Sequence, residues 1–109
     1  MALTINMANV NYPDADSETL SGTTASTVTI VTSSAPCTVD FLSRAVSNTL
    51  WLRFDGTGAA AAVKHNVPIP PNQSIGWRVP ADTTMTFSVA STGGTDAYTV
   101  TAVPQPVAA

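Results

Sequence analysis

Charged side chains are scarce in this chain of 109 residues, where they account for 10% of the sequence. An average soluble domain has about 25%. The four cationic residues lie far apart in the sequence: Arg44, Arg53, Lys64 and Arg78. Because a nucleic-acid site needs several cations on one face, we expect no nucleic-acid partner. So few charges protect a surface poorly against association, which indicates that part of it is covered in an assembly.

Reactive and metal-binding residues are equally scarce. Cys37 is the single cysteine and His65 the single histidine. One cysteine excludes an internal disulfide and a cysteine-rich metal site. Nucleophilic catalysis needs a nucleophile, a base and an orienting group, and no pattern around either residue supplies them. We therefore predict no catalytic residue, no metal site and no cofactor, with Cys37 buried in a strand and His65 in a surface loop.

Two short motifs resemble ligand sites but lack the required context. The glycine motif at 56–61 follows a predicted strand, as in dinucleotide-binding proteins, yet Pro68 leaves no room for the helix that should follow. Asp14, Asp16 and Glu18 alternate like the first ligands of a calcium loop, but the glycine and the distal glutamate of such a loop are missing. We interpret the second motif as a solvated acidic segment.

Long apolar runs are also absent. No run approaches the roughly 18–20 residues of a membrane-spanning helix, so we expect no membrane partner. Residues 1–6 contain neither a basic segment nor a continuous apolar one, and therefore do not resemble a signal peptide. We expect a product that is made in a cytoplasm and is not exported by the usual route.

What the sequence does contain is apolar residues alternating with threonine and serine over short stretches. This period places successive side chains on opposite faces of a strand. The pattern predicts strands at 27–30, 37–42, 50–55, 74–79, 84–89 and 98–102. Short strands separated by turn signals are typical of antiparallel sandwiches and barrels. We predict an all-β fold, a small antiparallel β-sandwich of the jelly-roll or immunoglobulin-like kind with an extended N-terminal arm.

The connections carry their own signals. The prolines within 67–72 place that stretch at a sheet edge or between sheets. Gly93-Gly94 predicts a hairpin between the strands at 84–89 and 98–102. The alanine-rich run at 58–65 is interpreted as a loop with one turn of helix, because it is too short for an independent helix.

The first 26 residues differ from the rest of the chain. A strand-like start leads through an acidic stretch into a Ser/Gly/Thr tract. We therefore divide the chain into an arm and linker at 1–26 and a β-sandwich domain at 27–109. Such an arm either completes the home sheet or pairs with a neighbour, and the alternative is a partly ordered tail.

The two tryptophans are given different roles. Trp77 shares a strand face with Ile75 and Val79, which predicts a core position. Trp51 lies on the face opposite to its apolar neighbours and close to Arg53. Because Trp and Arg are enriched at the centres of interfaces, Trp51 either anchors a subunit contact or lies under a loop or the arm.

The stretch Asn48-Thr49-Leu50-Trp51-Leu52-Arg53-Phe54-Asp55-Gly56-Thr57, followed by an alanine-rich loop, Val67-Pro68-Ile69-Pro70-Pro71 and Ser74-Ile75, resembles small virion proteins of tailed bacteriophages. Their shared pattern is an Arg-Phe-Asp-Gly-Thr strand exit and a proline-rich strand edge. The resemblance covers roughly residues 48–80. Asn72 stands where these proteins usually have glycine, and it tolerates the same turn geometry. No catalytic residue is implied.

The resemblance implies a non-enzymatic capsid decoration (cement) protein. Such a protein lies on the capsid surface of the virion, bridges neighbouring major capsid protein subunits and commonly forms a homotrimer. Its N-terminal arm often reaches the capsid or another subunit. The expected contact residues are Leu3, Ile5, Met7 and Tyr12 of the arm, together with Trp51 and Arg53.

Two alternatives remain open. The first is a structural protein of the phage tail, neck or fibre, with a receptor- or glycan-binding face that uses Trp51. The second is a small enzyme, which would need a pocket joining His65 or Cys37 to acidic residues.

Overall fold

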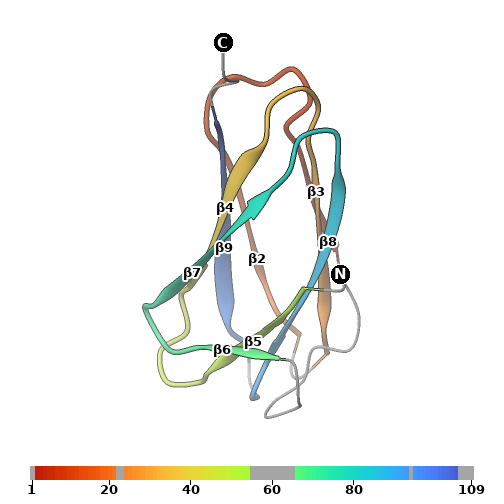
Figure 1. The fold of residues 1–109 in the computed structure, drawn as a ribbon. Coiled ribbons are helices and arrows are strands. Elements are labelled where there is room, and N and C mark those ends of the chain that lie inside the picture. Colours follow the sequence, from red (N-terminus) through yellow and green to blue (C-terminus); the bar gives the residue numbers. More distant parts are fainter. Residues whose placement is uncertain (1, 22–23, 55–65, 94, 106–109) are drawn as a thin grey trace.

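The computed structural model describes residues 2–21, 24–54, 66–93 and 95–105, which form two β-sheets packed face to face (Figure 1). No helix is present in these ranges. The strands are β1 (Ala2–Asn6), β2 (Asp14–Thr19), β3 (Ser26–Val31), β4 (Cys37–Ser43), β5 (Leu50–Arg53), β6 (Val67–Ile69), β7 (Ser74–Val79), β8 (Thr84–Ser91) and β9 (Ala97–Pro104). The all-β prediction is confirmed.

The first sheet has the strand order β1-β3-β8-β5-β6, and the second has the order β2-β9-β4-β7. Every strand pair is antiparallel except β1 and β3, which run parallel. The proline-containing β6 is an edge strand, as predicted, since proline has no N–H to donate to a further neighbour. The strands of the described residues therefore present four sheet edges: β1, β2, β6 and β7.

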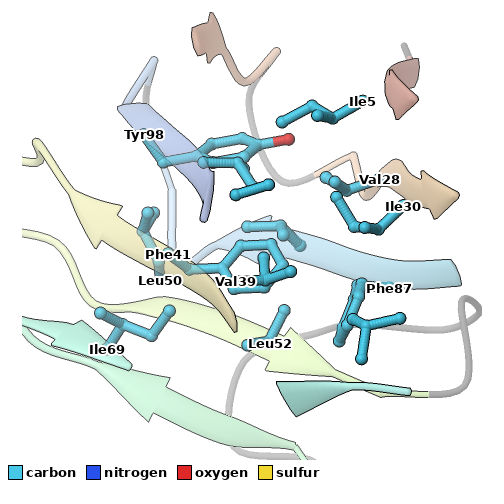
Figure 2. Packing of buried hydrophobic residues seen from close by; sticks show 14 of the residues in the cluster. Ile5, Val28, Ile30, Val39, Phe41, Leu50, Leu52, Ile69, Phe87 and Tyr98 are labelled. Carbon is cyan, nitrogen blue, oxygen red and sulfur yellow. The ribbon is translucent and has the colours of Figure 1, made fainter. Parts of the chain in front are cut away.

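The core lies between the inner faces of the two sheets (Figure 2). Alternation places Val28 and Ile30 of β3 inside, opposite Val39 and Phe41 of β4, and all four are almost completely buried. The Phe41 ring meets Phe87 of β8 edge to face, with centroids 5.0 Å apart. Burying each of these side chains contributes about 1.5–3 kcal/mol.

The hairpin predicted at Gly93-Gly94 is wrong. The preceding strand, β8, lies in the first sheet and pairs with β3 and β5, whereas the following strand, β9, lies in the second sheet between β2 and β4. The connection therefore crosses from one sheet to the other. Glycine signals a turn, but the turn residues alone do not determine whether the flanking strands pair with each other.

The segment at 1–26 contributes an edge strand to each sheet of its own chain. β1 pairs with β3, and the acidic stretch forms β2, which pairs with β9. Ile5, Met7 and Leu20 of this segment lie in the core. The sequence did not predict β2, because its exposed residues lack apolar alternation and backbone pairing with β9 determines its conformation.

The helical turn predicted at 58–65 lies outside the described residues. Within the described part of the chain, no helix is long and apolar enough to cross a membrane.

Candidate interaction surfaces

Trp51 and Arg53 lie together on the outer face of the first sheet. Their neighbours on β5, Leu50 and Leu52, are fully buried on the inner face. Ala90 of β8 lies directly opposite Trp51, and Ser88 lies opposite Arg53. Both small residues are almost completely buried although they face outward.

The Trp51 side chain is held in place at one edge. Its indole N–H donates to the Thr92 hydroxyl at 3.2 Å, and that hydroxyl donates to the Thr49 carbonyl at 2.8 Å. Trp51 is half-buried. A fixed, partly exposed indole loses little conformational entropy on binding, a property of interface anchors.

The four expected contact residues of the arm occupy different environments. Ile5 and Met7 are buried in the chain's own core, with exposed fractions of 2% and 4%. Leu3 is half-buried against that core, and only Tyr12 is well exposed, at 63%. The reason is that β1 extends the first sheet, so its inner face continues the home core. Alternation predicts an apolar face but does not identify the surface it packs against.

Three carboxylates line the side of the sandwich formed by β1 and β2, which we name the acidic side. Asp14, Asp16 and Glu18 of β2 lie directly opposite three buried, inward-facing residues of β9. Opposite residues of paired strands share a face. The three acidic side chains therefore lie on the inner face of the second sheet, at its edge.

Glu18 joins the two sheets on the acidic side. One of its carboxylate oxygens accepts hydrogen bonds from the hydroxyls of Tyr98 in β9 and Ser26 in β3. Tyr98 and Ser26 are each 1% exposed. Burial raises the pKa of Tyr98 well above its ordinary value, and the neighbouring Glu18 raises it further. The contact therefore holds Tyr98 in its protonated form.

The acidic side offers no site for a metal ion. No group of three histidine, cysteine, aspartate or glutamate side chains is placed to hold one within the described ranges. Cys37 is fully buried, as predicted, and burial raises the pKa of its thiol. His65 lies outside the described residues.

The opposite side of the sandwich, between β5 and β7, is aromatic, and we name it the aromatic side. Phe54, directly after β5, stacks on Trp77 of β7 with centroids 4.9 Å apart and an interplanar angle of 26°. Phe54 also meets Phe87 of the core edge to face, at 5.6 Å. Because β5 and β7 belong to different sheets, this stack joins the two sheets on the aromatic side, as Glu18 joins them on the acidic side.

The predicted core position of Trp77 is wrong, since the residue is 46% exposed. It does face inward, as Val79 does on the same strand. However, β7 is an edge strand, so an inward-facing residue there has a neighbouring strand on one flank only. The sequence specified the face of Trp77 but not its distance from the sheet edge.

A polar cluster that the sequence did not reveal holds the connection between β8 and β9. Asp96 is 9% exposed and accepts hydrogen bonds from the Ser91 hydroxyl and, at 3.0 Å, from the Asn48 side-chain amide. The Asp96 carbonyl also accepts from the Leu20 N–H at 2.8 Å. Asn48 and Leu20 come from distant parts of the chain, so no local motif could have identified the whole cluster. Their role is to fix the crossing between the sheets.

No protein-family model matches the chain, and no similar curated protein is found. Among solved structures, PliG from Aeromonas hydrophila, a periplasmic lysozyme inhibitor of g-type lysozyme, is similar with a TM-score of 0.61 and 9% identity. The similarity covers 95% of this chain and 96% of that chain. A de novo designed double-stranded β-helix is similar with a TM-score of 0.54 and 9% identity, over 84% of this chain and 99% of that chain.

At such low identity these similarities show the fold alone. Neither name describes an enzyme, and neither describes a virion protein.

Proposed function

We propose that this protein is a non-enzymatic decoration protein of a tailed-phage head, which bridges neighbouring major capsid protein subunits. The observation that carries the proposal is the placement of the phage-like stretch. Its described parts form β5, β6 and β7, which meet through the β5–β6 pairing and the stack of Phe54 on Trp77. The residues that resemble virion proteins therefore form one continuous region of the molecule.

This region has the chemistry of a docking surface. Trp51 and Arg53 lie on its outer face, and the half-exposed Trp77 lies at its edge. Partly exposed tryptophan and arginine side chains contribute strongly when a partner covers them. Many weak copies of such a contact, arrayed on a shell, give strong overall attachment. The proposed mechanism needs no cofactor.

The arm has a narrower role in this proposal than the sequence suggested. Ile5 and Met7 stabilise the home core, so Tyr12 and the exposed rim of Leu3 are the residues of the segment left to contact a shell. Deleting residues 1–20 would remove three core side chains, Ile5, Met7 and Leu20. Point variants therefore test attachment better than truncation.

The experiment is electron cryomicroscopy of particles from a phage that encodes this chain, with its density located and counted. Regular density between capsomers, present in hundreds of copies, is the expected result. Density confined to the tail or neck, in a few dozen copies or fewer, would replace the head role by the alternative structural role. The homotrimer that the resemblance implies would be visible in the same maps as density around three-fold positions.

Binding to undecorated heads then tests the surface. Arg53→Ala should reduce occupancy, whereas Arg44→Ala is the matched control, because Arg44 is an exposed arginine outside β5–β7. Equal occupancy of the two variants would contradict the assignment of this region.

Enzyme activity and enzyme inhibition are tested with the purified protein. Because A. hydrophila PliG is an inhibitor of g-type lysozyme, the lysozyme should be assayed in the presence of this chain. If this protein inhibits the lysozyme and is absent from phage particles, the decoration role is overturned. A hydrolytic activity that His65→Ala abolishes would overturn the non-enzymatic role.

A further inference from the structure

The four sheet edges are protected against further pairing to different degrees. β2 carries three inward-facing carboxylates, and inward-facing charges at an edge prevent another strand from adding. β6 has three residues and contains Pro68. β1 lies close to β2 of the opposite sheet. β7 has six residues, without proline or acid, and pairs with β4 alone. It is the unprotected edge of the described chain.

The register of β7 on β4 identifies the backbone groups at the open edge. The Ser43 N–H donates to the Gln73 carbonyl at 2.9 Å, directly before β7 begins. Along an antiparallel strand, residues that bond to the neighbour alternate with residues that point away from it. Ile75, Trp77 and Val79 therefore bond to β4, and the backbone groups of Ser74, Gly76 and Arg78 point away from the sheet.

We propose that β7 pairs antiparallel with β7 of a second copy of this chain, with Gly76 on the two-fold axis. In this register Gly76 is opposite Gly76 of the second copy, and Ser74 is opposite its Arg78. Each opposite pair exchanges two backbone hydrogen bonds. Centring the pair on Ser74 or Arg78 would place turn residues or Pro80 opposite the strand. Only the register centred on Gly76 uses all the outward-pointing groups of β7.

The side chains are self-complementary in the same register. On the inner face, Ile75 lies opposite Trp77 of the second copy and covers the indole, which is 46% exposed in one chain. Aromatic and β-branched residues are favourable cross-strand partners. The second chain thereby seals the aromatic side, where Phe54 already stacks on Trp77.

The outer face brings opposite charges together. A Cβ atom at Gly76 would lie 3.8 Å from the Asp40 carboxylate, so Asp40 is beside the proposed axis. Arg78 of each copy points to this outer face, two residues from the axis. The two carboxylates at the centre are thus flanked by two guanidinium groups, and the arginines are not opposite each other. This inference does not depend on the proposed role in a virion.

The first test is the mass of the full chain in solution across micromolar concentrations, by sedimentation equilibrium. We expect a reversible monomer–dimer equilibrium. Gly76→Pro removes the central N–H and should raise the dissociation constant at least about tenfold, or about 1.4 kcal/mol. Gly76→Ala is the matched control, since its Cβ meets nothing closer than 3.7 Å, and should leave the constant within about twofold.

A monomer at all concentrations, or a trimer that Gly76→Pro does not change, would overturn the proposal. Circular dichroism establishes that each variant is folded. If Gly76→Pro unfolds, Trp77→Lys replaces it, because an ammonium group in the apolar seam should also abolish the dimer. A folded Trp77→Lys protein that still dimerises would equally contradict the pairing.

Cross-linking tests the register itself. The Cα atoms of a hydrogen-bonded antiparallel pair lie about 5.5 Å apart, within the range of a disulfide. Gly76→Cys should therefore form a disulfide-linked dimer on mild oxidation. Ser74→Cys places the two thiols about 13 Å apart along the strands and should not. The native Cys37 is fully buried and present in both variants. Cross-linking of Ser74→Cys but not Gly76→Cys would overturn the register.

Discussion

The acidic side and the aromatic side join the same two sheets by different means. On the acidic side, Glu18 binds hydroxyls from both sheets, and two further carboxylates face inward along the edge. On the aromatic side, Phe54 stacks on a Trp77 that is 46% exposed, and no inward charge lies on β7. Buried hydrogen bonds fix geometry and repel other strands, whereas exposed aromatic area is stabilised further by a partner. The chain therefore has one side closed to association and one open to it.

Removing the carboxylate contact should produce the largest effect. Glu18→Ala removes the carboxylate that accepts hydrogen bonds from the buried hydroxyls of Tyr98 and Ser26, and we expect a loss of about 2–3 kcal/mol in the free energy of unfolding. Asp16→Ala is the matched control, because Asp16 is exposed and its carboxylate accepts a hydrogen bond from the Ser17 N–H of its own strand, at 2.8 Å. It should change stability by less than about 0.5 kcal/mol. Urea denaturation measures both, and equal losses would contradict the role of Glu18.

Alkaline pH should weaken the fold in two steps. Cys37, next to β7, and Tyr98, bonded to Glu18, have pKa values raised by burial. Between the ordinary pKa of each group and its raised pKa, the folded chain keeps a proton that the unfolded chain loses. The stability they contribute is complete below the ordinary pKa values of about 8.5 and about 10, and is lost as pH rises beyond them. The loss reaches about 1.4 kcal/mol per pH unit for each group.

Urea midpoints measured from about pH 8 to about pH 11 test this expectation. Cys37→Ala should remove the decline that begins at about pH 8.5, and Tyr98→Phe should remove the decline that begins at about pH 10. A midpoint that stays constant over the whole range would show that neither group remains protonated in the folded protein.

The sequence was sufficient for the parts of the fold that depend on local alternation. β3, β4, β7 and the inner residues of β5 follow directly from period-two patterns, because each strand turns one apolar face inward. β2 has no such pattern, because it is an edge strand and most of its residues are exposed to water. Its existence depends on pairing with β9, a contact between residues far apart in the sequence.

The candidate surfaces were predictable only in part. The sequence placed Trp51 and Arg53 on one strand face, and the structure brings them together. It did not place Glu18 beside Tyr98, or Phe54 beside Trp77, because each pair joins strands from distant parts of the chain. Which apolar face becomes core and which stays at a rim is decided by strand order, and strand order is a property of the whole chain.

Removing the indole from the aromatic side should have a moderate effect. Trp77→Ala loses the stack on Phe54 but only about half of a full burial, so we expect a loss of about 1–2 kcal/mol. The measurement is made in a Gly76→Pro background, so that association does not contribute. Tyr12→Ala is the control, since Tyr12 is 63% exposed and should cost less than about 0.5 kcal/mol. A Trp77→Ala loss as small as the control would show that the stack contributes nothing to stability.

The smallest effect on stability, and the sharpest test of the comparison, is expected at the edge of β2. Asp16→Val replaces an inward-facing carboxylate with a residue that favours strands, so the unfolding free energy should change by less than about 0.5 kcal/mol. Association should nevertheless increase, because the edge loses the central one of the three inward-facing charges that oppose the addition of a second strand. Ser17→Val makes a similar apolar replacement on the outer face of the same strand, opposite Thr99, and leaves the inward carboxylates in place. Light scattering in the Gly76→Pro background should show larger particles for Asp16→Val than for Ser17→Val. Equal scattering would mean that inward placement of the charge is irrelevant, and that the acidic side is kept free of partners by some property other than its carboxylates.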